Sequence, residues 1–372
     1  MTQHIKKIHL IAAARPNFMK IAPLYHSLKK QKWARPEIIH TGQHYDPNMS
    51  DAFFRDLNLP SPDYHLNVGS GSHAEQTGQV MIAYERLLMD QQPDLVVVVG
   101  DVNSTLAASL AAVKLEILVA HLEAGLRSFD HSMPEEINRI CTDHVCHRLW
   151  TPSPDGDKNL IAEGIPQNRI ERVGNIMIDA IELTRSRIEA EKTVHQMNLF
   201  HQSFGIVTLH RPANVDRHHQ LENIIQILLR LSEKMPLVFS VHPRTEKQLK
   251  RFQLLDSLKN CTNIILTPPM AYIPFMNLIF HTSMVITDSG GLQEETTYLG
   301  VPCLTIRPNT ERPITIEQGT NRLCTVENLE SEFYQALEHP VKYSKIPELW
   351  DGKTANRVVQ SIHQLLKPIA LI

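Results

Sequence analysis

Short apolar runs alternate with longer amphipathic stretches along the whole chain. The runs are rich in β-branched residues and apolar on consecutive positions, as expected for parallel strands covered on both faces. In the first half such runs lie at 7–14, 94–101 and 116–125, and helical stretches lie at 17–30, 74–90 and 104–114. This alternation of strand and helix predicts a doubly wound α/β fold.

The same pattern restarts in the second half, after a helical stretch at 176–192. Its strand-like runs lie at 205–210, 237–243, 263–269, 284–291 and 302–307. The chain has 372 residues, about twice the usual length of one domain. We therefore predict two domains, residues 1–174 and 175–353, followed by a last segment, 354–372, that begins with a helix.

Polar motifs gather where the predicted strands end. In open α/β sheets, ligands bind at the carboxyl ends of the strands, so these positions are candidates for a site. The motifs are Arg15, Thr41–His44, Gly100-Asp101 and His121–Glu123 in the first half, and His210-Arg211, His242–Arg244 and Asp288–Gly291 in the second. We expect both sets to face one cleft between the domains.

The charge balance restricts the kinds of ligand. Charged residues make up 21% of the chain and the formal net charge is −3, so no basic field exists that would hold nucleic acid or an anionic membrane surface. A phosphate-bearing ligand would need local cations. Those near the expected cleft are Arg15, His210, Arg211, Arg244 and Arg312. They suit a diphosphate. Any one of them alone is more often a surface salt-bridge residue, but their common place at the strand ends favours a binding role.

The amino-terminal run and the cysteines favour an intracellular protein without metal. No apolar run approaches the roughly 18–20 residues that span a bilayer. The first run reaches Arg15 and Pro16 almost at once, so we interpret it as a core strand rather than a secretory signal and expect a cytoplasmic protein. Five scattered cysteines without CxxC spacing, and 20 histidines without HExxH, predict reduced, mostly buried thiols and no metal site.

The segment 288–295, DSGGLQEE, has the pattern of a strand end, a glycine turn and a helix start. Glycines let the backbone approach a ligand, and the N–H groups of a helix N-terminus bind phosphate. A plain turn with a capped helix is equally compatible with the motif. Glu294 or Glu295 could accept ribose hydroxyls beside such a phosphate site, or simply stabilise the first helical turn. GxGxxG after the first strand and GxxxxGK[ST] are both missing, so neither a dinucleotide redox site nor a P-loop is expected.

Carboxylates and histidines at the strand ends are candidates for acid–base chemistry. Asp101, Glu123 and Glu135 lie in the same half, with arginines nearby in sequence. Proton removal beside a sugar carbon needs a base on one face and an acid on the other, which such carboxylates can supply. Glu135 and Glu136 could instead both be first-turn helix acids. His44, His210 and His242 are candidate acids, bases or phosphate donors, although a lone histidine more often has a structural role.

Together, these motifs resemble the non-hydrolysing UDP-N-acetylglucosamine 2-epimerases over nearly the whole chain. The matching stretches are ARPNFMKIAPL (14–24), TGQH (41–44), GDVNST (100–105), HLEAGLRS (121–128), PEEINR (134–139), VGN (173–175), TLHR (208–211), TDSGGLQEE (287–295) and TERP (310–313). The resemblance implies a glycosyltransferase-B-like pair of Rossmann-like domains, with the ligand in the interdomain cleft and the last helix packed on the first domain. It also implies a homodimer that uses no cofactor and no metal.

The implied reaction is inversion at C2 of UDP-GlcNAc to give UDP-ManNAc, for surface polysaccharide precursors. The C2 proton is removed, UDP is eliminated to leave a bound 2-acetamidoglucal, and UDP adds back with protonation from the other face. By the matching motifs, the catalytic residues are Asp101, Glu123, Glu135 and His210, with Arg139 orienting carboxylates. The UDP-binding residues are Arg15, Lys20, Ser289, Gly290, Gly291 and Glu295, with Arg312 a further cleft residue. His242 and Arg244 are candidates for substrate binding from their place at a strand end.

Several stretches depart from the family pattern. AAARP (12–16), HRPAN (210–214) and HPRT (242–245) differ from the commoner motifs, and QHYDPNMSDAFF (43–54) replaces a loop that binds an activating second UDP-GlcNAc. A related 2-epimerase for UDP-2,3-diacetamido-glucuronic acid shares the QHYD, NMSDAFF, PDYHL and NSTLA stretches, so the C3 and C6 substituents stay open. The sequence is also compatible with a hydrolysing epimerase. The paired carboxylates argue against a glycosyltransferase, and the presence of Asp101, Glu123, Glu135 and His210 together argues against an inactive nucleotide-sugar regulator.

Overall fold

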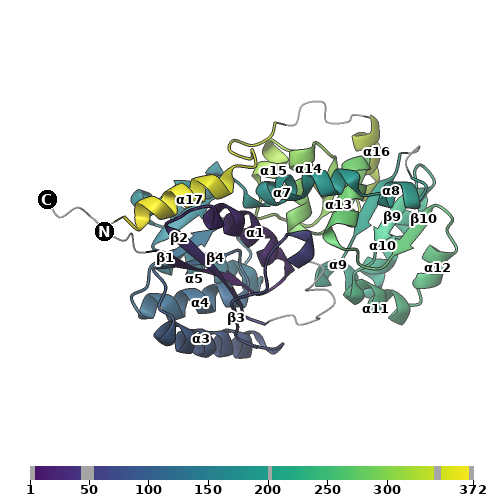
Figure 1. Cartoon of the computed structure of the whole chain (residues 1–372). Helices are drawn as coiled ribbons and strands as arrows, with labels where there is room; N and C mark the ends of the chain where they lie inside the picture. Colours follow the sequence, from purple (N-terminus) through teal and green to yellow (C-terminus); the bar gives the residue numbers. More distant parts are fainter. Residues whose placement is uncertain (1–4, 43–53, 200–202, 339–344, 368–372) are drawn as a thin grey trace. The chain divides into compact units, whose positions relative to one another are not determined.

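The computed structural model describes residues 5–42, 54–199, 203–338 and 345–367 (Figure 1). The chain divides into two compact units, of which the first holds the residues up to Leu183 and those from Glu348 onward, and the second holds 184–347. Each unit contains a parallel sheet flanked by helices. The predicted pair of doubly wound, Rossmann-like domains is therefore confirmed.

The sheet of the first unit has the strand order β3-β2-β1-β4-β5-β6-β7. β1 pairs with β2 on one side and with β4 on the other, so the direction of winding reverses between β1 and β4. The strands are β1 (Lys6–Ala12), β2 (Ala34–His40), β3 (Tyr64–His65), β4 (Leu95–Val99), β5 (Val119–Leu122), β6 (Arg148–Thr151) and β7 (Ile170–Arg172). The helices are α1 (Arg15–Lys29), α3 (His73–Asp90), α4 (Asn103–Lys114), α5 (Pro134–Val145) and α6 (Pro154–Ala162), with a 3-10 turn, η1 (Gln167–Arg169).

The core of the first unit forms around β4. All residues of this strand, LVVVV, are buried, as the unbroken apolar run predicts for a central parallel strand. Val96 and Val98 pack with Ala108 and Ala112 of α4, and the small alanine side chains let this helix lie close to the sheet. The carboxyl ends of β1, β4 and β5, which carry the candidate residues, thus project from a rigid layer.

The sheet of the second unit has the order β10-β9-β8-β11-β12-β13, in which the direction reverses between β8 and β11. The strands are β8 (Gly205–Thr208), β9 (Leu237–Ser240), β10 (Ile264–Thr267), β11 (Met284–Thr287), β12 (Cys303–Ile306) and β13 (Asn321–Cys324). The helices are α8 (Thr193–Gln196), α9 (Pro212–Val215), α10 (His218–Ser232), α11 (Pro243–Arg251), α12 (Leu255–Lys259), α13 (Tyr272–His281), α14 (Gly290–Leu299), α15 (Ile314–Glu317) and α16 (Leu329–Glu338).

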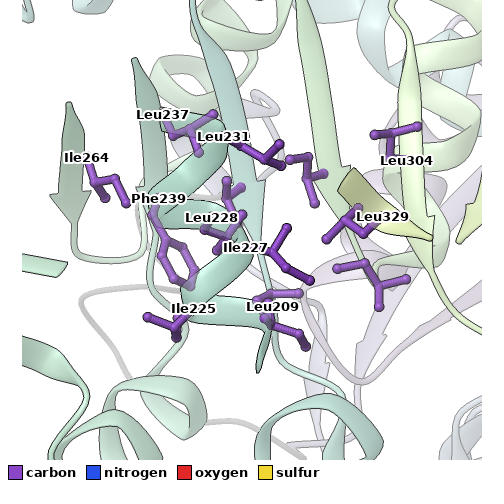
Figure 2. Packing of buried hydrophobic residues seen from close by; sticks show 14 of the residues in the cluster. Leu209, Ile225, Ile227, Leu228, Leu231, Leu237, Phe239, Ile264, Leu304 and Leu329 are labelled. Atoms are coloured by element: carbon purple, nitrogen blue, oxygen red, sulfur yellow. The ribbon is translucent and has the colours of Figure 1, made fainter. Parts of the chain in front are cut away.

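The core of the second unit lies between its sheet and the amphipathic helix α10. Figure 2 shows Ile225 and Leu228 of α10 beside Phe239 of β9, within one buried cluster that extends to Leu304 of β12 and Leu329 of α16. Burial of such side chains contributes roughly 1.5–3 kcal/mol each. β8 and β11, which carry the second set of candidate residues, are held by this packing.

The end of the chain returns to the first unit. Helix α17 (Thr354–Leu365) packs on α1, and Trp150 of β6 donates from Nε1 to Ser361 Oγ at 2.9 Å. The division between the units falls within α7 (Ile176–Ala190) rather than at Gly174, where we predicted a boundary. The first half of α7 stays with the first unit because Asp179 accepts the backbone N–H groups of Thr354 and Ala355.

All five cysteines lie in the described residues and are unpaired. Cys146, Cys303 and Cys324 are buried, Cys261 is half-buried and Cys141 is exposed. This confirms the prediction of free, mostly buried thiols. Within the described ranges, no helix is both long and apolar enough to cross a membrane.

Candidate active site

Two predicted residues of the first unit form a buried ion pair at the switch point of its sheet. Lys20 lies on α1 after β1, and its Nζ is bonded to Oε2 of Glu123, which follows β5. The side chains are 9% and 4% exposed. Gly100, after β4, packs against both groups, since a Cβ there would lie 3.0 Å from Lys20 Nζ and 3.6 Å from Glu123 Oε2. This close approach, together with a φ of +67°, requires glycine at position 100.

Glu123 itself has a backbone conformation that is rare for residues with a side chain. Its φ is +78°, and its N–H donates to the Trp150 carbonyl at 3.0 Å. Such a conformation costs roughly 1–3 kcal/mol and persists only where the surrounding structure fixes it, most often at functional sites. The strain therefore supports Glu123 as a site residue. No sequence pattern indicated this backbone conformation.

Arg139 on α5 joins two carboxylates of the first unit. Its Nη1 is bonded to Asp101, and its Nε and Nη2 donate to Glu136 Oε2 at 3.0 and 2.6 Å. Asn138 Nδ2 also donates to the Asp101 carbonyl at 2.9 Å. Asp101 is thus fixed at both its backbone and its side chain. The orienting role of Arg139 in catalysis stays a prediction.

Glu136, rather than Glu135, is the buried acid of this helix start. Glu136 accepts the backbone N–H groups of Ser128 and Phe129 at 3.0 and 2.8 Å, besides its bonds to Arg139. Burial raises the pKa of Glu136, but these donors outweigh that effect and hold the pKa below its ordinary value. Glu135, our predicted catalytic residue, is exposed on the first turn of α5. Its catalytic role stays a prediction. The interpretation of Glu136 as a first-turn helix acid holds, but it did not indicate that Glu136 is buried and bonded to Arg139.

A buried charged network lies behind the turn that carries Asp101. His121 Nδ1 lies 2.6 Å from Asp143 Oδ1, and His121 Nε2 lies 2.8 Å from the Gly100 carbonyl. Arg127 Nη1 lies 2.8 Å from Asp143 Oδ2. Burial raises the pKa of Asp143, but His121 and Arg127 hold it below its ordinary value. Sequence reasoning missed this network, although a histidine inside the apolar strand VAHL was a signal that it has a buried partner.

In the second unit, the predicted residues again gather where the winding reverses. His210 follows β8 and the DSGG turn follows β11. Asp288 is fully buried and accepts the N–H groups of His210 and Arg211 at 3.1 and 2.9 Å, and its Oδ1 lies 2.9 Å from His210 Nδ1. Burial raises the pKa of Asp288, but His210 and the other donors outweigh it and keep the pKa low. Asp288 stood in our motif without a predicted role.

The glycine turn opens α14 as predicted, and its two glycines have different surroundings. A Cβ on Gly290 would lie 2.7 Å from Glu311 Oε1 and 2.8 Å from Arg312 Nη1, whereas nothing lies within 4 Å of one on Gly291. Arg312 is buried, with its Nε 2.9 Å from Glu294 Oε1, and it is also paired with Glu311. The helix N-terminus at Ser289 thus has a guanidinium beside it, and this guanidinium would have to exchange a carboxylate partner to bind a phosphate.

Other predicted binding residues have partners within the second unit. Glu295 is buried and accepts from Tyr272 Oη at 3.3 Å. The ring of His242 lies 5.6 Å from that of His210, and burial together with His210 lowers the pKa of His242. Arg244 is bonded to Asp216 through Nε and Nη2, at 2.9 and 2.5 Å, so binding a diphosphate would require it to exchange a carboxylate partner.

Two further candidate residues belong to the first unit by their position in the chain. Arg15 is the first residue of α1, and His44 lies outside the described residues. In the part of the chain that the structure describes, no group of three or more His, Cys, Asp or Glu side chains is arranged to hold a metal ion. By the contacts described above, the first unit offers carboxylates for proton transfer, and the second offers a helix N-terminus with histidine and arginine for an anion.

Comparison with known proteins identifies the family. A family model described as UDP-N-acetylglucosamine 2-epimerase matches residues 26–363. A relative of that name from Methanocaldococcus jannaschii is 43% identical over 366 residues, covering 95% of this chain and 98% of the relative. UDP-2,3-diacetamido-2,3-dideoxy-D-glucuronate 2-epimerase from Pseudomonas aeruginosa is 38% identical over 321 residues, covering 85% and 88%. The crystal structure of the M. jannaschii enzyme in complex with UDP-GlcNAc and UDP has a TM-score of 0.89 and 42% identity, covering 96% of this chain and 99% of that chain. This chain therefore belongs to the UDP-N-acetylglucosamine 2-epimerase family, whose members are isomerases.

Proposed function

We propose that this chain is a non-hydrolysing epimerase that interconverts UDP-GlcNAc and UDP-ManNAc. The observation that carries the proposal is the buried Lys20–Glu123 pair beside Gly100-Asp101, at the switch point of the first sheet. Carboxylates held at this position can move a proton to and from a sugar carbon. The M. jannaschii relative, whose crystal structure contains UDP-GlcNAc and UDP, supports the choice of substrate.

In the proposed reaction, a carboxylate of the first unit takes the proton from C2 of the sugar. The C1–O bond breaks, its electron pair leaves with UDP, and C1 and C2 become joined by a double bond. The reverse steps return UDP to C1 and deliver a proton to the opposite face of C2. Asp101, Glu123 and Glu135 are the proposed proton carriers, and no cofactor enters these steps.

The second unit would hold the leaving group. The N–H groups at the start of α14, with Ser289, Gly290 and Gly291, would bind the diphosphate together with Arg312 and His210. Glu295 would accept the ribose hydroxyls, and Arg15, Lys20, His242 and Arg244 would complete the substrate contacts. That both units bind the same ligand is part of the proposal, as the family resemblance implies.

Positional isotope exchange tests the elimination step. UDP-GlcNAc carrying ¹⁸O in the bond between C1 and the β-phosphate is incubated with the protein and followed by ³¹P NMR. Elimination makes the β-phosphate terminal, so its oxygens become equivalent by rotation, and the label is expected to move into non-bridging positions. Epimerisation with the label retained in the bridge would exclude elimination of UDP.

UDP-2,3-diacetamido-2,3-dideoxy-D-glucuronate is the second candidate substrate. The named Pseudomonas relative and the shared stretches between 43 and 107 favour it. The two nucleotide sugars are compared by kcat/KM under the same conditions. We expect UDP-GlcNAc to be preferred, and a larger value for the diacetamido uronic acid would replace our assignment. Free ManNAc and UDP as products would instead indicate a hydrolysing enzyme.

We also infer, as the family resemblance implies, that the protein forms a homodimer. We infer further that it acts in the cytoplasm, in the synthesis of surface polysaccharide precursors. Light scattering on the purified chain, whose mass is 42.4 kDa, tests the first of these. A mass near twice that of the chain is expected, and a monomer at working concentration would contradict it.

A further inference from the structure

A single buried carboxylate connects the two strand ends at the switch point of the second unit. Asp288 follows β11 and precedes α14, and three backbone or amide N–H groups point at it. They belong to His210, Arg211 and Asn214, at 3.1, 2.9 and 3.1 Å. A carboxylate that accepts this many hydrogen bonds is stabilised in its ionised form, and an ionised carboxylate can only accept further hydrogen bonds.

The fourth contact of Asp288 decides which ring nitrogen of His210 carries a hydrogen. Its Nδ1 lies 2.9 Å from Asp288 Oδ1, so Nδ1 must carry the hydrogen of this bond. Nε2 is then the nitrogen that can exchange a proton with a ligand. The side chain of His210 is 40% exposed, whereas that of Asp288 is 0% exposed. The carboxylate is therefore behind the imidazole and shielded from solvent.

We propose that Asp288 is a positioning residue that fixes the Nδ1–H tautomer of His210 and presents Nε2 to the substrate. Its effect on turnover rests on the proposed function, but its effect on the tautomer does not. A carboxylate behind a histidine selects the tautomer and ring orientation, and it stabilises the imidazolium that forms when Nε2 takes up a proton. The same Asp288 precedes the helix start, so it also sets His210 relative to the expected diphosphate site.

Asp288→Asn is the direct test, with Asn214→Ala as its matched control. Asparagine keeps the size of the side chain but presents N–H groups, which favours the opposite tautomer of His210. Asn214→Ala removes one donor to Asp288 and one to the Ile306 carbonyl, and it leaves the Nδ1 contact in place. We expect Asp288→Asn to lower kcat by about 10²–10³-fold and to change the dissociation constant for UDP by less than about threefold. Asn214→Ala is expected to change kcat by less than about threefold.

Two measurements separate positioning from a merely structural role. The tautomer is read by two-dimensional ¹H–¹⁵N NMR on protein with labelled histidine, and the His210 signals are assigned with the His210→Asn variant. In the wild type, His210 is expected to show the pattern of the Nδ1–H form. In Asp288→Asn, that pattern is expected to disappear. In a His210→Asn background, Asp288→Asn is expected to lower kcat by no more than about threefold further.

The inference is overturned if wild-type His210 is the Nε2–H tautomer, if the tautomer survives in Asp288→Asn, or if the two substitutions lower kcat independently. The wild-type spectrum decides even if Asp288→Asn does not fold. Failure of the wild-type protein to convert any UDP-sugar would count against the proposed function alone, because the tautomer is read without turnover.

Discussion

Lys20 on α1 is ion-paired with Glu123 in the turn after β5, and Gly100 packs against both charged groups. Two charges buried together stabilise a fold only modestly, but removal of one leaves the other without compensation. The same pair follows β1 and β5, at the carboxyl edge of the sheet, where a doubly wound fold binds its ligand. Stability and turnover therefore respond differently to changes at these two positions.

Glu123→Gln is expected to lower turnover by about 10³-fold, because glutamine cannot accept or return a proton. UDP affinity should change by less than about threefold, since the lost charge is on the sugar side of the proposed site. The unfolding free energy should fall by roughly 1–3 kcal/mol, because Lys20 stays buried without its anionic partner. NMR assays, calorimetric UDP titration and urea unfolding measure the three effects.

The double variant Lys20→Met, Glu123→Gln is the control for that result. Methionine removes the uncompensated charge at similar size, so stability should recover towards that of the wild type. Turnover should stay low. If restored stability also restored turnover, Glu123 would have no part in the chemistry.

Glu135 and Glu136 are adjacent and chemically identical, yet their substitution should affect stability and turnover differently. Glu135→Gln removes an exposed charge, so we expect the unfolding free energy to change by less than about 0.5 kcal/mol while turnover falls by at least about 10²-fold. Glu136→Gln weakens the bonds to Arg139, Ser128 and Phe129, and should cost about 2–4 kcal/mol. Urea unfolding and initial-rate assays on both variants check this. Full turnover in Glu135→Gln would remove Glu135 from the mechanism.

The two glycines that open α14 separate folding from UDP binding. Gly290→Ala should cost roughly 1–3 kcal/mol of stability, because its Cβ would displace the buried Glu311 and Arg312 side chains. Gly291→Ala should leave stability unchanged or slightly higher, but raise the dissociation constant for UDP by about tenfold or more if the phosphates lie there. Gly78→Ala in α3, where a Cβ also meets nothing within 4 Å, is the matched control and should leave UDP affinity unchanged. Unaltered affinity in Gly291→Ala would place the diphosphate elsewhere.

His40 should make the first unit less stable in mild acid. Burial, with a smaller effect of His65, lowers the pKa of His40 to about 4, from 6.5 in the unfolded chain. The neutral form is therefore favoured in the fold, so its contribution is complete above pH 6.5 and is lost as the pH falls towards 4. Between pH 7 and pH 5 the loss is about 2 kcal/mol.

The variant His40→Phe tests this assignment. The ring of His40 stacks on Phe18, with centroids 5.2 Å apart, so phenylalanine can keep the stacking without titrating. Urea unfolding at pH 7 and pH 5 measures the loss of unfolding free energy between these two pH values. This loss should be about 2 kcal/mol smaller in His40→Phe than in the wild type. The exposed His144→Gln is the control and should behave as wild type. An unchanged pH dependence in His40→Phe would mean that other groups cause it.

Hydrophobic periodicity was sufficient to predict the fold, because covered parallel strands are apolar at every position. The run at 94–101 contains β4, and the pattern at 354–366 contains α17. The helix start at Arg15 was predicted two residues late, since Pro16 suits a first helical turn and was not used to place it. β7, with its residues only half-buried, carries no comparable signal.

Contacts between distant segments could not be predicted in the same way. Asp143 meets His121 because α5 packs beside β5, and Asp288 meets His210 because β11 pairs with β8. Neither contact can be deduced from spacing along the chain. Which of Glu135 and Glu136 is buried depends on the rotation of α5 about its axis, about 100° per residue. A motif can therefore indicate a carboxylate at a helix start without indicating which one faces the core.

A proton NMR time course with UDP-GlcNAc in deuterated water tests the central claim most directly. The proposed mechanism breaks the C2–H bond and re-forms it with a solvent-derived hydrogen. UDP-ManNAc should therefore accumulate with deuterium at C2 while the nucleotide stays attached to the sugar. Formation of UDP-ManNAc that retains hydrogen at C2, or release of free ManNAc and UDP as the only products, would contradict non-hydrolysing epimerisation by proton removal at C2.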